Sequence, residues 1–173
     1  MTDMTLARAS ALVLAALACA IDVRTRRIPN VLTFGAAACA LVVHFAVGGA
    51  GGLADALLGW LVGTAVLLAP YALGGMGAGD VKLLGAIGAC VGPGDACWVA
   101  IYTGIAGGAL GLVVACAHGY LGQALRNVRM ALMHWRIFGL EPVPELTLET
   151  SRGPRLAYAA PILVGTLVTL WLR

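Results

Sequence analysis

The chain has 173 residues, of which 61% are hydrophobic and only 11% are charged, and its formal net charge is +3. Soluble domains carry roughly 25% charged residues, so the composition excludes an ordinary soluble domain and indicates an integral membrane protein. The basic residues flank apolar runs, which fits a membrane surface better than a nucleic-acid partner.

The apolar residues fall into runs close to the roughly 20 residues that cross a bilayer as a helix. We therefore expect an all-α, polytopic membrane protein that forms a single domain over residues 1–173, with about six transmembrane helices. The expected spans are residues 6–22, 31–47, 53–73, 80–92, 96–122 and 156–172, with a cytoplasmic loop over residues 123–155.

The first apolar run, residues 6–22, has two interpretations. Residues 18–20, Ala-Cys-Ala, look like the small-residue cleavage site of a secretory signal peptide. However, the strong arginine cluster at residues 24–27 follows the run instead of preceding it. By the positive-inside rule, this cluster predicts a transmembrane helix with its N-terminus outside and Asp22 at its cytoplasmic end.

Turn-forming residues separate the next spans. Pro29 is placed to open a second helix, where its missing N–H does no harm. The glycine-rich stretch 48–52 contains no basic residue, as expected of an outside loop. Asp55 follows it, and because acidic residues favour helix N-termini, we expect a solvated carboxylate at a helix start. Asp95 is expected in a later outer turn.

The stretch Gly74–Gly85 places Asp80 and Lys82 among glycines and apolar residues. An ionisable group in such a segment is costly, which makes Asp80 a candidate functional group. From Asp80 to Gly92 there are 13 residues, and a helix of that length covers about 20 Å of a hydrocarbon core about 30 Å thick. We therefore expect Asp80 below the cytoplasmic membrane surface or in a thinned bilayer, with its irregular backbone buried in protein or beside a wet cavity.

The second half of the chain predicts packing and surface elements. Residues 96–122 are rich in small residues that favour close helix packing, namely Gly104, Gly107, Gly108 and Gly111. Residues 123–138 predict an amphipathic helix on the inner membrane surface. Arg126 and Arg129 are expected on one side, and the other side is available to Leu125, Val128, Leu132 and Met133. A plain cytoplasmic loop is the alternative. The acidic residues that follow are expected to be solvated, namely Glu141, Glu145 and Glu149.

The distribution of basic residues predicts the orientation. Nine are expected on the inner side and two outside, which is a strong bias under the positive-inside rule. The inner set is Arg24, Arg26, Arg27, Lys82, Arg126, Arg129, Arg136, Arg152 and Arg155, and the outer set is Arg8 and Arg173. Both termini are then outside, and Asp22 and Asp80 lie at the same cytoplasmic face.

Asp22 and Asp80 form a candidate catalytic pair. Two carboxyl groups in a partly dehydrated site share a proton, because both cannot ionise easily. One can then act as base on a water while the other acts as acid on a scissile carbonyl, which is the chemistry of an aspartic protease. Gly77 and Gly79 would let an extended peptide approach the backbone. Lys82 either biases the ionisation of the pair or extends to the inner headgroups.

The same pattern leaves other classes open. Asp80 and Lys82 could line the path of a small ion-coupled transporter, and a non-catalytic membrane subunit of a pilus or secretion machine is a third reading. Asp22 could also be a charge that ends a helix. The five cysteines occur singly without metal-ligand spacing, so no metal and no cofactor is expected. Nothing in the pattern fixes the oligomeric state.

Three segments carry a family resemblance. They are Gly77-Ala-Gly79-Asp80-Val-Lys82-Leu, Asp22 with Arg26-Arg-Ile-Pro-Asn30, and Ala160-Pro-Ile-Leu-Val-Gly165. Together they resemble, in the same order, the type IV prepilin peptidases and preflagellin peptidases, which are membrane aspartyl proteases with a Gly-x-Gly-Asp motif. The resemblance spans nearly the whole chain.

The resemblance implies cleavage of the short basic leader of prepilin-like precursors, at the cytoplasmic face of a bacterial or archaeal inner membrane. Asp22 and Asp80 would be the catalytic dyad, with Gly77, Gly79 and Lys82 as the supporting motif. Larger members carry an N-terminal region with paired cysteines and also methylate the new N-terminus. Here the first helix begins within a few residues of Met1, so the chain resembles the short peptidases of tight-adherence (Flp-type) pili, and methyl transfer is unsupported.

Overall fold

The computed structural model describes residues 2–143 and 157–173. These residues form five α-helices and no strand, which confirms the all-helical expectation. The helices are α1 (Thr2–Thr25), α2 (Asn30–Ala72), α3 (Ala78–Ala117), α4 (Leu121–Phe138) and α5 (Ala159–Leu172). Residues 144–156, with the expected solvated acids Glu145 and Glu149, lie outside the described residues.

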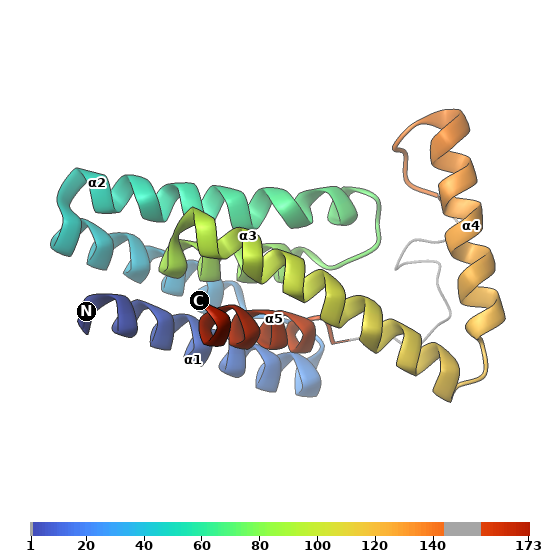
Figure 1. Ribbon diagram of the computed structural model, residues 1–173, viewed down its shortest axis with the longest axis horizontal. Coiled ribbons are helices and arrows are strands. Elements are labelled where there is room, and N and C mark those ends of the chain that lie inside the picture. Colours follow the sequence, from blue (N-terminus) through green and yellow to red (C-terminus); the bar gives the residue numbers. More distant parts are fainter. Residues whose placement is uncertain (1, 144–156) are drawn as a thin grey trace.

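The two longest helices, α2 and α3, are each folded back on themselves at one glycine (Figure 1). Gly49 has φ 59° and ψ −144°, and Gly92 has φ 80° and ψ 172°. Both lie in the positive-φ region that glycine reaches without the steric penalty of a Cβ atom. Each helix therefore consists of two arms, which meet at this glycine.

One helix end differs from its expectation. The fifth expected span runs to residue 122, but α3 ends at Ala117. Gly119 has φ 72°, and the N–H groups of His118 and Gly119 bond back to carbonyls of α3. This turn ends α3 before the amphipathic segment begins at Leu121.

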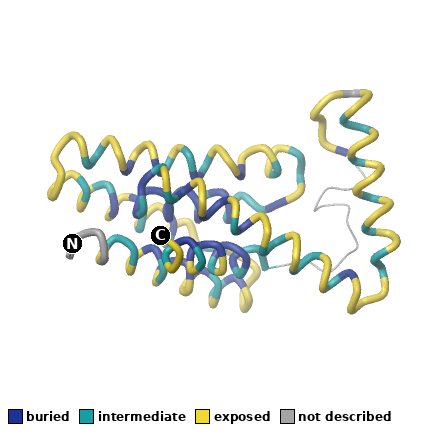
Figure 2. Tube along the Cα trace, viewed as in Figure 1, coloured by how far each residue is buried: buried dark blue, intermediate teal, exposed yellow. Residues whose placement is uncertain are grey.

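Three of the described helices are long and apolar enough to cross a membrane, namely Leu6–Thr25 in α1, α2 and α3. α5 is apolar but has only 14 residues. The outer sides of the helices carry exposed apolar side chains, such as Val31 and Trp171, and appear as long exposed stretches in Figure 2. Exposed apolar surface of this extent marks a membrane-facing protein.

The core is built around the first arm of α3. Nearly every residue from Val81 to Cys90 in this arm is buried, including Leu83, Leu84 and Ile87 at 0% exposure (Figure 2). The arm packs against α2 on one side and against Ile162 of α5 on another. Asp80, at the beginning of this arm, is therefore anchored to the most completely buried segment of the described residues.

Glycines set the distance between the second arm of α2 and the first arm of α3. A Cβ at Gly63 would collide with the backbone carbonyl of Leu84, and a Cβ at Gly59 would collide with that of Gly88. The close packing expected at the four glycines of residues 104–111 is largely absent. A Cβ atom added at Gly107 would meet the ring of Tyr158, but a Cβ atom added at any of the other three would have no neighbour within 4 Å. The reason is that the second arm of α3 runs out beyond the bundle (Figure 1).

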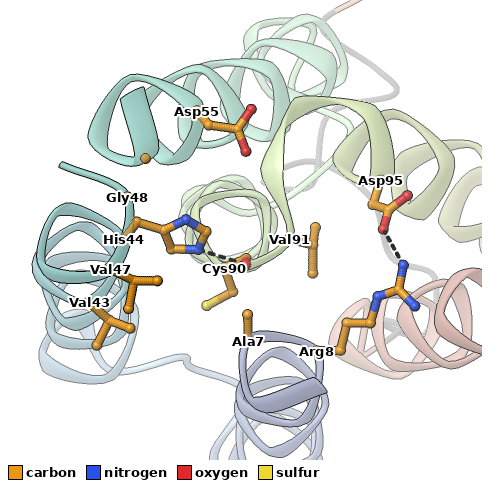
Figure 3. A pocket seen from close by; sticks show the side chains of 11 residues that line it. Ala7, Arg8, Val43, His44, Val47, Gly48, Asp55, Cys90, Val91 and Asp95 are labelled. Atoms are coloured by element: carbon orange, nitrogen blue, oxygen red, sulfur yellow. Dashed lines mark hydrogen bonds and ion pairs between the residues drawn. The ribbon is translucent and has the colours of Figure 1, made fainter. Parts of the chain in front are cut away.

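The end of the bundle that holds the two glycine bends also contains two ion pairs between described residues. Asp95 forms ion pairs with Arg8, at 3.5 Å, and with Arg173, at 3.6 Å. Beside this cluster lies a cavity of about 270 Å³, into which His44 points while its Nε2 contacts the Cys90 carbonyl at 3.2 Å (Figure 3). Asp95 thus ties the first and last helices to the bend of α3.

Candidate active site

Asp22 lies in the last turn of α1 and is buried, with 7% of its surface exposed. The helix ends just after it because the chain changes direction at Arg26, whose φ of 54° is unusual for a residue with a side chain. The Thr25 hydroxyl stabilises this turn because its single hydrogen can be donated to the carbonyl of Ile21 or to that of Arg27, at 2.9 and 3.0 Å. The burial of a carboxylate at a helix end argues against a simple solvated terminus.

Pro29 links the Asp22 turn to the next helix, as its position in the sequence predicts. It is the N-cap residue of α2 in an extended conformation, with φ −63° and ψ 133°, and its carbonyl accepts from Leu32 and Thr33. The segment Arg26–Asn30 is consequently held as a short, fixed connection next to Asp22.

Asp80 lies in the first turn of α3 and is also buried, with 9% exposed. Gly77 is the N-cap, and its carbonyl accepts a hydrogen bond from the Asp80 N–H at 3.2 Å. A carboxylate in the first turn of a helix is stabilised by the unpaired N–H groups there. The side chain of Asp80 lies beside Gly77, where a Cβ atom would stand 3.4 Å from Asp80 Oδ2, at ordinary contact distance.

Gly79 brings the two aspartate segments into contact. A Cβ at Gly79 would stand only 3.3 Å from Cβ of Ile28, tighter than ordinary packing. The missing side chain therefore lets the connection after Asp22 lie directly on the first turn of α3. The sequence interpretation assigned Gly79 to the approach of a peptide, and the structure gives this glycine a role in assembling the site as well.

Asp22 and Asp80 line the same pocket, which has a volume of about 320 Å³. They are close enough for the charge of Asp22 to act on Asp80. The other lining residues are Arg26, Arg27, Ile28, Asn30, Gly77, Ala78, Gly79 and Lys82. All five residues singled out from the sequence, the two aspartates and the supporting motif, are thus brought to one place.

Lys82 has a partner that the sequence interpretation did not assign. Its Nζ donates to Asn30 Oδ1 at 2.9 Å and lies 5.4 Å from the centroid of the Phe34 ring. Lys82 therefore links the first turn of α3 to the first turn of α2. The sequence feature that could have pointed to Asn30 as a site residue is its position at the end of the Ile-Pro-Asn segment.

Tyr158, at the N-terminus of α5, is a second residue that the sequence did not single out. Its phenol is close enough to Asp80 for the charge of the carboxylate to act on it. The ring packs on Gly107, and its Oη lies 2.9 Å from the position that a Cβ atom of residue 107 would take. It brings the last helix to the neighbourhood of the aspartates. Within the described ranges no group of three or more side chains is arranged to hold a metal ion.

Comparison with known proteins decides the family. Residues 9–112 match the model of the type IV leader peptidase family, which is more than half of the chain. The chain belongs to the type IV leader peptidase family. This confirms the resemblance drawn from the motifs, and it identifies a protease of the prepilin peptidase type at the level of the family. No curated protein and no solved structure matches the chain.

The matched region contains the whole candidate site except Tyr158. It runs from within α1 to the second arm of α3, so Asp22, Asp80 and Lys82 all fall inside it. α4 and α5 lie beyond it. The family match therefore covers the segments that carry both carboxylates.

Proposed function

We propose that the protein is a membrane aspartic endopeptidase that removes the short basic leader from prepilin-like precursors at the cytoplasmic face of the membrane. The observation that carries the proposal is the burial of Asp22 and Asp80 in one pocket, although 57 residues separate them along the chain. Family membership supports the same reaction class.

Two buried carboxyl groups that line one open pocket are suited to hydrolysis of a peptide bond. The ionised carboxylate takes a proton from a water, whose oxygen attacks the carbonyl carbon of the scissile bond. The protonated partner donates to the carbonyl oxygen as the tetrahedral intermediate forms. The C–N bond then breaks, and the leaving nitrogen takes up a proton from the pair. Both products leave with the aspartates unchanged.

The proposed topology has six membrane crossings, made by α1, the two arms of α2, the two arms of α3, and α5. Both termini lie outside in this arrangement, and the pocket of Asp22 and Asp80 faces the cytoplasm. The positive-inside bias supports it, because the arginines around the pocket fall on the expected inner side. The proposed location is the inner membrane of a bacterium or archaeon.

The partners in this proposal are the bilayer and a prepilin-like membrane protein. Such a substrate would present its leader at the membrane surface, next to an apolar segment that stays in the lipid. Among such enzymes, the chain fits the short, tight-adherence type of peptidase. Family membership favours the peptidase over the ion-coupled transporter and the non-catalytic subunit.

The experiment that tests the proposal is processing of a co-expressed prepilin whose basic leader ends in glycine ahead of an apolar run. Asp22→Asn and Asp80→Asn should each abolish the shift to the shorter product while the protein remains in the membrane fraction. Asp55→Asn, the same chemical change at an exposed position at the other end of the bundle, is the matched control and should process normally. Normal processing by either pocket variant would refute the proposal.

A further inference from the structure

The helix α4 carries a surface that the peptidase reaction does not use. It runs across the long axis of the bundle, beyond the end where α1 finishes and α3 begins (Figure 1). Its sequence contains three arginines and no acidic residue. Large apolar side chains on it are nevertheless exposed, including Leu125 at 60%, Leu132 at 59% and Ile137 at 74%.

Arginine and apolar side chains share one face of this helix, whereas the sequence led us to expect Arg129 opposite the apolar residues. Arg129 and Arg136 are two turns apart, about 10 Å along the axis, and both are exposed. They line a hollow of about 330 Å³. Its other lining residues are Leu125, Val128, Leu132 and Met133.

We propose that α4 lies in the headgroup layer of the membrane and that this hollow holds the phosphate of an anionic phospholipid. The two guanidinium groups match the charge and the hydrogen-bonding geometry of a phosphate. The surrounding leucine, valine and methionine side chains suit the adjoining glycerol and acyl region. Arginine stems can lie along such apolar surface while their charged heads reach the phosphates.

The direction of α4 selects a membrane as the occupant. A helix lying across membrane-crossing helices at one end of a bundle runs parallel to the bilayer plane, which is the position of an interfacial helix. The charge of the face opposes the rival occupant, the basic leader of a precursor, because arginines repel it. The inference rests on membrane insertion, and does not require that the enzyme cleaves any particular substrate.

The test is hydrogen–deuterium exchange of the full-length protein in nanodiscs of phosphatidylcholine alone or mixed with phosphatidylglycerol. Backbone amides of residues 121–138 should exchange more slowly in the anionic discs. Arg129→Gln or Arg136→Gln should reduce that protection roughly fivefold, because one arginine near an anionic surface contributes about 1 kcal/mol of binding free energy. High salt should also reduce the protection in the anionic discs, because it screens the attraction between the arginines and the lipid phosphates.

Arg126→Gln is the matched control. It removes the same charge from the same helix, but the Arg126 side chain folds over Gly122 and does not line the hollow. It should lose clearly less protection than Arg129→Gln. Equal losses in the two variants, equal exchange in both lipids, or protection of α4 that appears only on adding a protein partner would overturn the proposal.

The readout is separate from proteolysis. Asp80→Asn, which should be inactive, should keep the full lipid response of α4. Failure of the peptidase proposal would leave this response in place, and failure of the lipid proposal would leave cleavage in place. The two claims can therefore be distinguished.

Discussion

Lys82 shows how single side chains hold the two aspartate segments together. The sequence suggests that it acts on the ionisation of the pair or reaches the headgroups, whereas its ammonium donates to Asn30 at 2.9 Å. Asn30 begins α2, at the end of the short connection that follows Asp22 and α1. This hydrogen bond fixes the start of α3, and with it Asp80, against the Asp22 segment.

Lys82→Ala and Asn30→Ala should each slow prepilin cleavage by roughly 10- to 150-fold, because a hydrogen bond to a charged group is worth about 1.5–3 kcal/mol. If the two residues act through this one bond, the double variant should be no slower than either single variant. Initial cleavage rates of purified protein give the comparison. Additive losses, or complete inactivity of Lys82→Ala, would show that Lys82 acts in some other way.

For single residues, the sequence predicts which charged side chains belong to the site, but it does not predict which residues they contact. Asp22, Asp80 and Lys82 stand out because ionisable groups are rare in apolar segments. The contact of Ile28 with Gly79 and the approach of Tyr158 to Asp80 join residues more than 50 positions apart. Such pairs depend on how helices pack, which a single sequence does not encode as a local pattern.

The helices themselves follow closely from local chemistry. The sequence predicts turns at residues 48–52 and directly after Gly92, and the structure bends at Gly49 and Gly92, where glycine adopts positive φ without strain. The glycine contacts between helices were not predicted correctly. Residues 104–111 look like a packing face, but the close approach is made by Gly59 and Gly63 against α3.

Gly63→Ala should destabilise the protein by about 1–3 kcal/mol, the usual cost of adding a carbon atom to a filled interior. Its new Cβ would meet the backbone of Leu84, which cannot rotate away. Gly104→Ala is the matched control, since nothing lies within 4 Å of that position and alanine favours a helix. Thermal unfolding in detergent should show a lower Tm for the first variant only, and equal Tm values would contradict the packing described here.

The whole molecule separates its charges between two ends. Arg8 and Arg173, the basic residues expected outside, both pair with Asp95. Their charges are thereby partly neutralised at that end, while Arg26, Arg27 and Lys82 surround the pocket at the other. This pairing strengthens the charge bias on which the proposed orientation depends.

The orientation predicts which surface positions are accessible from outside the cell. In full-length chains with the native cysteines replaced by alanine, Gly94→Cys should react with a membrane-impermeant maleimide in intact cells. Gln123→Cys should react only after the membrane is opened. Both positions are exposed, so the difference reports on the side of the membrane. The reverse pattern would place the aspartate pocket outside.

The most direct test of the central claim is whether Asp22 and Asp80 work as one unit. Single-turnover cleavage of a prepilin should be compared among the parent protein, Asp22→Asn, Asp80→Asn and the double variant. Each single change should reduce the rate by roughly 10²–10⁴-fold, the contribution of acid–base catalysis, and the double change should reduce it no further. A single variant with parental rate, or losses that multiply in the double variant, would contradict a shared catalytic pair.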